Sequence, residues 1–175
     1  MNIQNFIAQR GQPVSVTKYD YVFMQGDLDE NLYAVRSGLL KAYYVSADGN
    51  ETIKSFLRPG CMIASLRAVH KKEQCSYNLR ALVDSELVKV PFAELYEASQ
   101  ETHAISLELI SFLLGLSMKK EQREYDFLNL SAEERYQNFV VENMDLAEKL
   151  TQNDIARYLG ITPVALSRIK KRLLA

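Results

Sequence analysis

The last part of the chain, residues 151–173, constrains the fold more than any other segment, because it holds two helix starts, a tight turn and clustered positive charge. Its sequence, TQNDIARYLGITPVALSRIKKRL, predicts two short helices. Thr151 is placed to cap the first helix, and Gly160 is the residue best able to end it in a left-handed conformation. Ile161 is then expected to fill the turn. The apolar side of the first helix consists of Ile155, Ala156 and Leu159.

The second predicted helix begins at Pro163, with Thr162 in front of it as N-cap, an order typical of helix starts. Its apolar positions recur at helical spacing and are expected to form one side; they are Val164, Leu166 and Ile169. The polar and basic side chains lie mainly on the other faces; they include Ser167, Arg168, Lys171 and Arg172.

The positive charge of the chain is concentrated in this segment. From residue 151 to residue 175 there are five basic residues and one acidic residue, a net charge of +4, whereas the whole chain carries −1. A helix suits the major groove of DNA when its exposed face offers phosphate ligands and groups that reach base edges. The planar fork of Arg168 can bond guanine O6 and N7 together, and Lys170, Lys171 and Arg172 suit phosphates. The segment therefore predicts a DNA-reading helix-turn-helix, with a merely solvated helical hairpin as the alternative.

Length and composition favour a globular protein. The chain has 175 residues, of which 47% are hydrophobic, enough for one large or two small domains with real cores. No run of about 18 apolar residues occurs, and the N-terminus lacks a basic-then-apolar signal segment, so we expect a cytoplasmic protein with no membrane partner. Cys61 and Cys75 are expected to be reduced, with a redox switch as the alternative.

The first half of the chain predicts a β domain. From Val14 to about Pro91, short β-rich runs alternate with turn signals roughly ten to twelve residues apart, as in a compact barrel or roll. The runs LLKAYYVS and ETIKSFLR read as one hairpin, because the Asp48-Gly49 dipeptide between them suits a tight turn.

A short helix, PFAELYEAS, and then a long helix between about Glu101 and Leu128 follow the β domain. The long helix is apolar nearly all round in its first half, and one small roll covers only one side, so we expect a homodimer built on it. The alternative is that a single chain folds back over this stripe. The apolar stripe recurs at helical spacing at Ile105, Leu109, Phe112 and Leu116, and it is widened by Leu107, Ile110, Leu113 and Leu114. The expected dimer interface is Leu109, Phe112, Leu113 and Leu116.

A capping box formed by Ser131 and Glu134 predicts a new helix after a hinge at residues 128–130. We therefore expect an α+β protein of two domains. Residues 1–128 form a jelly-roll-like, double-stranded β-roll with a dimerisation helix at about 100–128, and residues 129–175 form an all-α helix-turn-helix domain.

In this combination of elements the chain resembles the Crp/Fnr (catabolite activator/fumarate-nitrate regulator) family of transcription regulators. The resemblance rests on NLYAVRSGLLKAYY at residues 31–44, RPG at 58–60 and SAEERY at 131–136, and it covers almost the whole chain. It implies a homodimer that binds a palindromic operator in double-stranded DNA and contacts RNA polymerase. It also implies that Thr162 holds a phosphate, that Lys171 contacts the backbone, and that four residues face base edges, namely Pro163, Val164, Ser167 and Arg168.

The chain departs from the cyclic-nucleotide-binding members of that family. Where those members have a Gly-Glu pair for the ribose and an Arg-Ser pair for the phosphate, this chain has Ala64-Ser65 and Cys75-Ser76. A buried anionic phosphate needs a cation or several aimed N–H groups, and Arg80 is expected on another face of its strand. We therefore predict weak binding of cyclic AMP or none. The corresponding effector pocket would be lined by Ile63, Ala64, Ser65, Cys75, Ser76, Met118 and Lys119.

Other effectors find little support in the residues. An iron–sulfur cluster needs about four thiolates and the chain has two, while His70 and His103 are separate, which disfavours haem or a clustered metal site. No cofactor is therefore predicted. The roll is left to bind an unknown small molecule, to respond to a protein or to act as a scaffold.

The sequence stops directly after the predicted recognition helix, where most relatives have a β-hairpin wing, so we expect reduced non-specific affinity. A sensory or interaction dimer without specific DNA binding is the alternative function. An enzyme is disfavoured because no nucleophile with a nearby base, metal triad or phosphate loop is evident.

Overall fold

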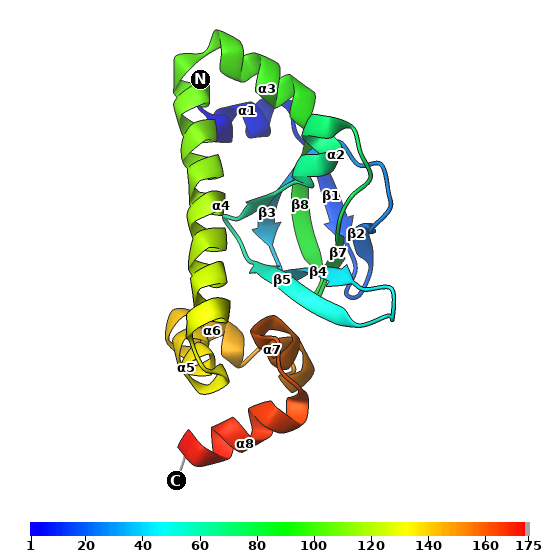
Figure 1. The fold of residues 1–175 in the computed structure, drawn as a ribbon. Helices are drawn as coiled ribbons and strands as arrows, with labels where there is room; N and C mark the ends of the chain where they lie inside the picture. Colours follow the sequence, from blue (N-terminus) through cyan, green and yellow to red (C-terminus); the bar gives the residue numbers. More distant parts are fainter. Residues whose placement is uncertain (174–175) are drawn as a thin grey trace. The chain divides into compact units, whose positions relative to one another are not determined.

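The computed structural model describes residues 1–173 and has two compact units, Met1–Leu113 and a second unit from Leu114 onward (Figure 1). The first unit combines two antiparallel sheets with helices, and the second is all-helical. The α+β architecture predicted from the sequence is confirmed.

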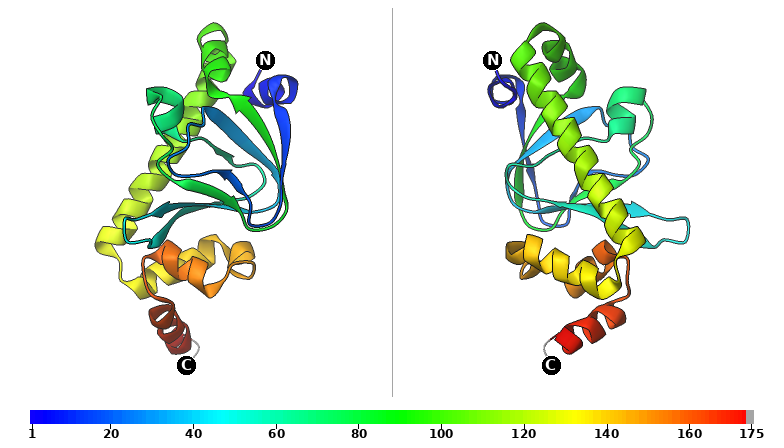
Figure 2. Two further views of the ribbon diagram at one scale, coloured as in Figure 1. Left: turned by 90° about the vertical axis from the view of Figure 1, so that its right-hand side faces the viewer. Right: turned by 60° about the vertical axis from the view of Figure 1, so that its left-hand side comes forward.

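The first unit is a roll of two four-stranded sheets that face each other (Figure 2). One sheet has the order β1-β8-β3-β6 and the other β2-β7-β4-β5. The strands are β1 (Gln12–Val16), β2 (Tyr21–Phe23), β3 (Asn31–Ser37), β4 (Leu40–Val45), β5 (Glu51–Leu57), β6 (Met62–Ile63), β7 (Asn78–Ala81) and β8 (Ser85–Pro91).

Two turns fix the register of these strands. The predicted hairpin is confirmed: β4 pairs with β5 across the Asp48-Gly49 turn, with Leu40 opposite Leu57. The turn between β3 and β4 requires glycine, because Gly38 has φ +97° and a Cβ atom there would lie 2.1 Å from the Ser85 hydroxyl.

The core of the roll lies between the inner faces of the two sheets. In β7 the side chains alternate, so that Leu79 and Ala81 are buried while Arg80 between them is not. Aromatic rings fill the centre: the centroid of the Phe23 ring lies 5.4 Å from the centroid of the Tyr77 ring and 6.0 Å from that of the Tyr33 ring. The inner-face core is therefore closely packed with aromatic and aliphatic side chains.

The helices of the first unit are α1 (Ile3–Arg10), α2 (Leu66–Lys71), α3 (Phe92–Glu101) and the beginning of α4 (His103–Asn129). Residues of α1, α3 and α4 form a second core against β3 and β8, and Figure 2 shows α1 and α3 at the same end of the roll. The sequence predicted α3 and α4 but not α1 or α2, because eight and six residues are too few for a clear helical period.

The second unit contains the rest of α4 and the helices α5 (Ala132–Glu142), α6 (Met144–Ala147), α7 (Gln152–Leu159) and α8 (Pro163–Leu173). The capping box is confirmed, since Ser131 and Glu134 each accept a hydrogen bond from the other's backbone N–H at the start of α5. The core of this unit consists of Phe139, Leu146, Leu150, Ile155, Ala156, Leu159, Leu166 and Ile169.

The compact units divide inside α4, between Leu113 and Leu114, and not at the predicted hinge after residue 128. The reason is that the second half of α4 contacts the helices that follow it, through Arg123 and Phe127. Within residues 1–173, no helix combines the length and the apolar character that crossing a bilayer requires.

Candidate nucleic-acid interface

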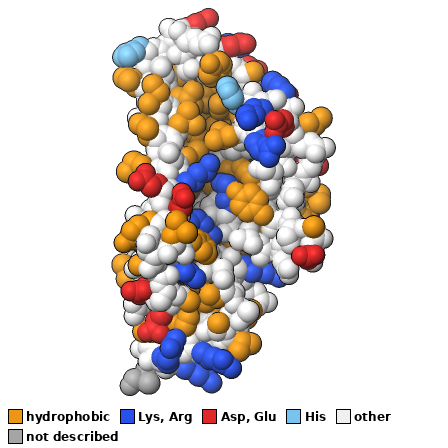
Figure 3. Space-filling model, in the orientation of Figure 1, with side chains coloured by type: hydrophobic (Ala, Val, Ile, Leu, Met, Phe, Trp, Pro, Cys, Tyr) orange, Lys and Arg blue, Asp and Glu red, His pale blue; other side chains and the backbone are white. Residues whose placement is uncertain are grey.

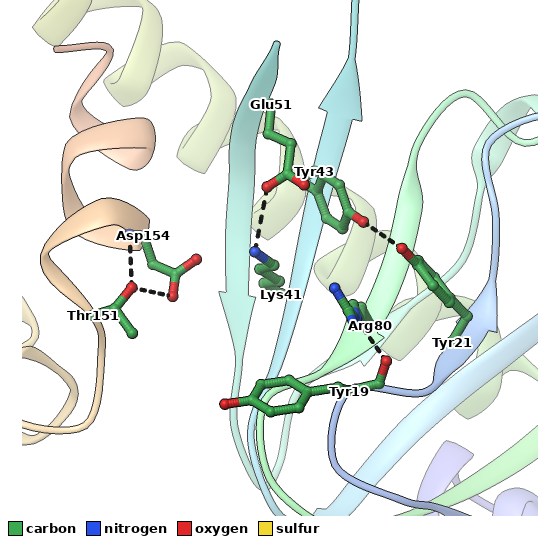
Figure 4. A network of polar contacts seen from close by, with 8 residues as sticks. All are labelled: Tyr19, Tyr21, Lys41, Tyr43, Glu51, Arg80, Thr151 and Asp154. Carbon is green, nitrogen blue, oxygen red and sulfur yellow. Dashed lines mark hydrogen bonds and ion pairs between the residues drawn. The ribbon is translucent and has the colours of Figure 1, made fainter. Parts of the chain in front are cut away.

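The helix-turn-helix is formed by α7 and α8, and its first half follows the predicted caps. The Thr151 hydroxyl accepts from the Asp154 amide at 3.1 Å and donates to the Asp154 carboxylate at 2.7 Å (Figure 4). Gly160 ends α7 with φ +68° and ψ 34°, as expected for a left-handed C-cap. Ile161 is half-buried in the turn.

The start of α8 also follows the prediction, with one correction. The Ala165 amide donates to the Thr162 hydroxyl at 3.1 Å, and Pro163 is the first helical residue. Leu166 and Ile169 are buried against the rest of the unit. The assignment of Val164 to the apolar side is wrong, because its side chain is 61% exposed. The helical period leaves Val164 one turn before Ser167 and Arg168, on the outward face.

The outward face of α8 presents most of the residues predicted to contact DNA. Figure 3 shows Lys and Arg side chains gathered over α8. Lys170 is half-buried, while the exposed ones are Thr162, Pro163, Val164, Ser167, Arg168, Lys171 and Arg172. The exposed face is thus cationic at its C-terminal half and small or apolar at its N-terminal end.

One of these cations has a partner inside the unit. Arg172 Nη2 lies 2.9 Å from Glu133 Oε2 on α5, and the Arg172 side chain remains 67% exposed. Because an exposed ion pair contributes little free energy, a phosphate can replace the carboxylate at small cost. Arg172 must exchange this carboxylate for a phosphate, whereas Lys171, the preceding residue of α8, is exposed.

The apolar stripe of α4 divides into two faces, which corrects the expected dimer interface. Leu109 is only 6% exposed and Phe112 packs beside it, because both belong to the second core of the roll. Leu109 is therefore unavailable to a second copy. Leu116 is half-buried and Leu113 is 38% exposed. The outward apolar positions are Leu107, Ile110, Leu113, Leu114 and Met118.

The predicted effector segments come together in the first unit only in part. Ala64, Ser65 and Cys75 are all buried, and the Tyr77 hydroxyl donates to the Ala64 carbonyl at 2.9 Å, which joins the two segments. Burial raises the pKa of the Cys75 thiol, which keeps it neutral. Ile63 is buried and Ser76 half-buried in the same unit, whereas Met118 and Lys119 are exposed residues of the second unit.

Arg80 takes part in a network on the outer face of its sheet. Its Nε donates to the Tyr19 carbonyl at 2.6 Å, and its guanidinium lies 5.1 Å from the Tyr21 ring centroid. The Tyr21 and Tyr43 hydroxyls share a hydrogen bond of 2.9 Å (Figure 4). The prediction that Arg80 lies on another face than the effector segments is confirmed, because its strand neighbours point into the core.

Neither thiol is oxidised to a disulfide: Cys61 and Cys75 are both free. Across the part of the chain that the structure describes, no group of three or more His, Cys, Asp or Glu side chains is arranged to hold a metal ion. His70 and His103 are both exposed.

Comparison with known proteins gives a consistent set of relatives. Residues 13–102 match the cyclic nucleotide-binding domain family. The chain is 30% identical to the transcriptional activator protein anr of Pseudomonas aeruginosa over 179 residues, which cover 95% of this chain and 71% of that protein. It is 29% identical to the anaerobic regulatory protein of Pasteurella multocida over 179 residues, which cover 95% of this chain and 64% of that protein.

Solved structures show the same fold at lower identity. FixK2 from Bradyrhizobium japonicum has a TM-score of 0.82 and 21% identity, with 93% of this chain and 84% of that one covered. The Thermus thermophilus catabolite activator protein has a TM-score of 0.61 and 20% identity, with 98% and 82% covered. The succession of roll, long helix and terminal helices along the chain is thus shared with these proteins.

Proposed function

The chain belongs to the Crp/Fnr family of transcription regulators, and from that premise we propose that it binds a palindromic operator in double-stranded DNA as a homodimer. In this arrangement the two copies of α8 enter successive major grooves, about 34 Å apart. The observation that carries the proposal is the exposed face of α8, where Arg168 and Lys171 project on the side away from Leu166 and Ile169.

The residues of that face have different roles in the proposal. Thr162 and Lys171 contact phosphates, together with Lys170 and Arg172. Arg168 reads guanine with its planar fork. Pro163, Val164 and Ser167 lie at the N-terminal half of α8, where apolar groups suit thymine methyls and a hydroxyl suits either base edge.

The outward stripe of α4 is the proposed dimer interface. Leu107, Ile110 and Leu114 are 51%, 50% and 58% exposed in the single chain, and Leu113 adds to them. Burying such side chains contributes about 1.5–3 kcal/mol each when burial is complete, and both copies contribute. Symmetry places the same stripe on each partner, as a two-fold interface requires.

For the sensory half, we propose an effector other than cyclic AMP. The Ala64-Ser65 and Cys75-Ser76 segments offer a buried neutral thiol and hydroxyls where an anionic phosphate needs a cation. Titration calorimetry with cyclic AMP is expected to give no binding at micromolar concentration. Tight binding would overturn this part of the proposal.

Further parts of the proposal follow from family membership. Residues 1–128 serve sensing and dimerisation, and residues 129–175 serve DNA binding. The protein acts in the cytoplasm, where operator DNA and RNA polymerase are present, and RNA polymerase is its proposed protein partner.

Gel shifts with genomic fragments from around its own gene test the DNA proposal. The wild-type protein is expected to retard a subset of fragments, and Arg168→Ala is expected to abolish that selectivity. Lys149→Ala is a matched control, because Lys149 is an exposed cation outside α8. Equal retardation of all fragments by wild type and Arg168→Ala would favour a sensory or interaction dimer without specific DNA binding.

A further inference from the structure

Arg123, near the end of α4, is tied to the first helix of the helix-turn-helix. Its Nη2 donates to the Tyr158 carbonyl at 2.8 Å, and Tyr158 is the last but one residue of α7. The guanidinium also lies 4.2 Å from the centroid of the Tyr158 ring. Carbonyls in the last turn of a helix have no partner within the helix and carry partial negative charge, so a cation there is favourable. Arg123 thus binds both the backbone and the ring of Tyr158.

Phe127, one turn further along α4, rests against the turn between α7 and α8. A Cβ atom built at Gly160 would lie 2.7 Å from Phe127 Cε1, so the ring occupies the space that any other residue at 160 would need. Glycine suits position 160 because of its positive φ, and a side chain there would also have to displace the Phe127 ring. The Phe127 ring also lies 4.9 Å from the guanidinium of Arg123.

A second arginine closes this cluster from α5. The Arg135 guanidinium lies 4.9 Å from the Phe127 ring, and its Nη1 donates to the Leu130 carbonyl at 2.8 Å. The hinge between α4 and α5 is thereby bridged by a side chain. The two cation–π contacts at Phe127, whose side chain is 39% exposed, contribute about 0.5–1 kcal/mol each, and the hydrogen bonds to fixed carbonyls add direction.

These contacts fix three points of the DNA-binding unit to one helix: the end of α7, the turn before α8 and the start of α5. The same helix carries the outward stripe of Leu107, Ile110 and Leu114, through which the two copies meet in the proposed dimer. The orientation of each α8 relative to the end of α4 is consequently set by side chains that do not face DNA.

We propose that Arg123 and Phe127 are positioning residues that set the spacing between the two recognition helices, and so select operators by the distance between their half-sites. This inference rests on the proposed function. When these contacts hold α8 rigidly to α4, the dimer fits operators of one half-site spacing. When they are lost, each α8 can reach a half-site displaced by a base pair, but binding to the correct operator is weaker because α8 must then be ordered on binding.

The test measures affinity for DNA duplexes that carry the selected operator, versions with one base pair added or removed at its centre, and an isolated half-site. The variants are Arg123→Gln and Phe127→Leu, with Lys120→Gln as the matched control, because Lys120 is an exposed cation on the same helix. Arg123→Lys is included because it keeps the charge but loses the planar fork.

Wild type and Lys120→Gln are expected to prefer the correct spacing by about tenfold or more, in the range of a single mismatched base pair. Arg123→Gln is expected to lose most of that preference, weakening on the correct operator while its half-site affinity stays unchanged. The spacing preferences of Phe127→Leu and Arg123→Lys are expected to lie between those of wild type and Arg123→Gln.

Three results would overturn the inference. Full spacing preference in Arg123→Gln and Phe127→Leu would show that other contacts set the spacing, while the proposed function stands. An equal loss of affinity on every duplex, half-site included, with a lowered melting temperature would show a general folding role. Failure of the wild-type protein to select any operator would overturn the proposed function together with this inference.

Discussion

The Glu108 carboxylate on α4 accepts a hydrogen bond of 2.9 Å from the Ile3 amide, which joins residues 105 positions apart. Ile3 is the first residue of α1, where backbone N–H groups lack partners within the helix and carry partial positive charge. A carboxylate at this point both satisfies an N–H group and complements the helix dipole. The contact secures α1 over the second core, in which Ile3, Phe6 and Ile7 are buried.

Replacing Glu108 with Gln is expected to destabilise the first unit by about 0.5–1 kcal/mol, because the amide keeps the hydrogen bond but loses the charge. Thermal unfolding followed by circular dichroism measures the change. Glu97→Gln is the control, since Glu97 is an exposed acid on α3. Identical melting of both variants and wild type would show that the contact contributes no stability.

Placing a charge on the outward stripe of α4 is expected to separate the dimer. Ile110→Glu introduces a carboxylate on a position that is 50% exposed in the single chain, and the two copies would bring like charges together. Sedimentation velocity should then report a folded monomer. Leu109→Ala is the contrasting change: it is expected to lower the free energy of unfolding by about 2–5 kcal/mol and to leave the dimer intact. A monomeric Leu109→Ala protein beside a dimeric Ile110→Glu protein would reverse the assignment of the two faces.

Removing the phosphate-binding charge of Lys171 is expected to weaken DNA binding to all sequences alike. In Lys171→Gln the slope of log affinity against log salt should fall in magnitude by about one, because one fewer counterion is released. Fluorescence anisotropy between low and moderate salt measures the slope. Arg172→Gln is expected to change it less, since Arg172 is already paired with Glu133. A slope unaffected by Lys171→Gln would place that side chain away from phosphate.

The helix ends of the helix-turn-helix were predictable because their signals are local. Thr151, Gly160, Thr162 and Pro163 each fix a helix end through the backbone next to them, and the structure has all four in those places. The capping box of α5 and the turn between β4 and β5 were predictable for the same reason.

The features that could not be predicted from the sequence depend on contacts between distant segments. Leu109 and Leu107 are equally apolar, and only the packing of α1 and β8 against α4 decides that one is buried and the other exposed. The division at Leu113 and the contacts of Arg123 follow likewise from folding of α4 onto α7, which no local spacing reports. Val164 was misassigned because the apolar count alone does not reveal where the buried face of α8 ends.

The capping box of α5 is expected to make the stability of the second unit depend on pH in the acid range. The Ser131 backbone N–H donates to the Glu134 carboxylate at 2.8 Å, and this bond, with a further one to the Ser131 side chain, lowers the pKa of Glu134 in the folded protein. The unfolded chain therefore binds the proton more readily, so the contribution is present above the ordinary carboxyl pKa of about 4.3 and is lost as pH falls through the lower, folded value. Between about pH 6, above that ordinary value, and about pH 3, below it, wild type should lose more stability than Glu134→Gln, which keeps an acceptor that does not titrate. Urea unfolding of the two proteins at each pH gives the difference, with Glu148→Gln as a control at an exposed acid elsewhere in the unit. Parallel pH profiles for wild type and Glu134→Gln would show that the Ser131 contact does not hold the carboxylate ionised.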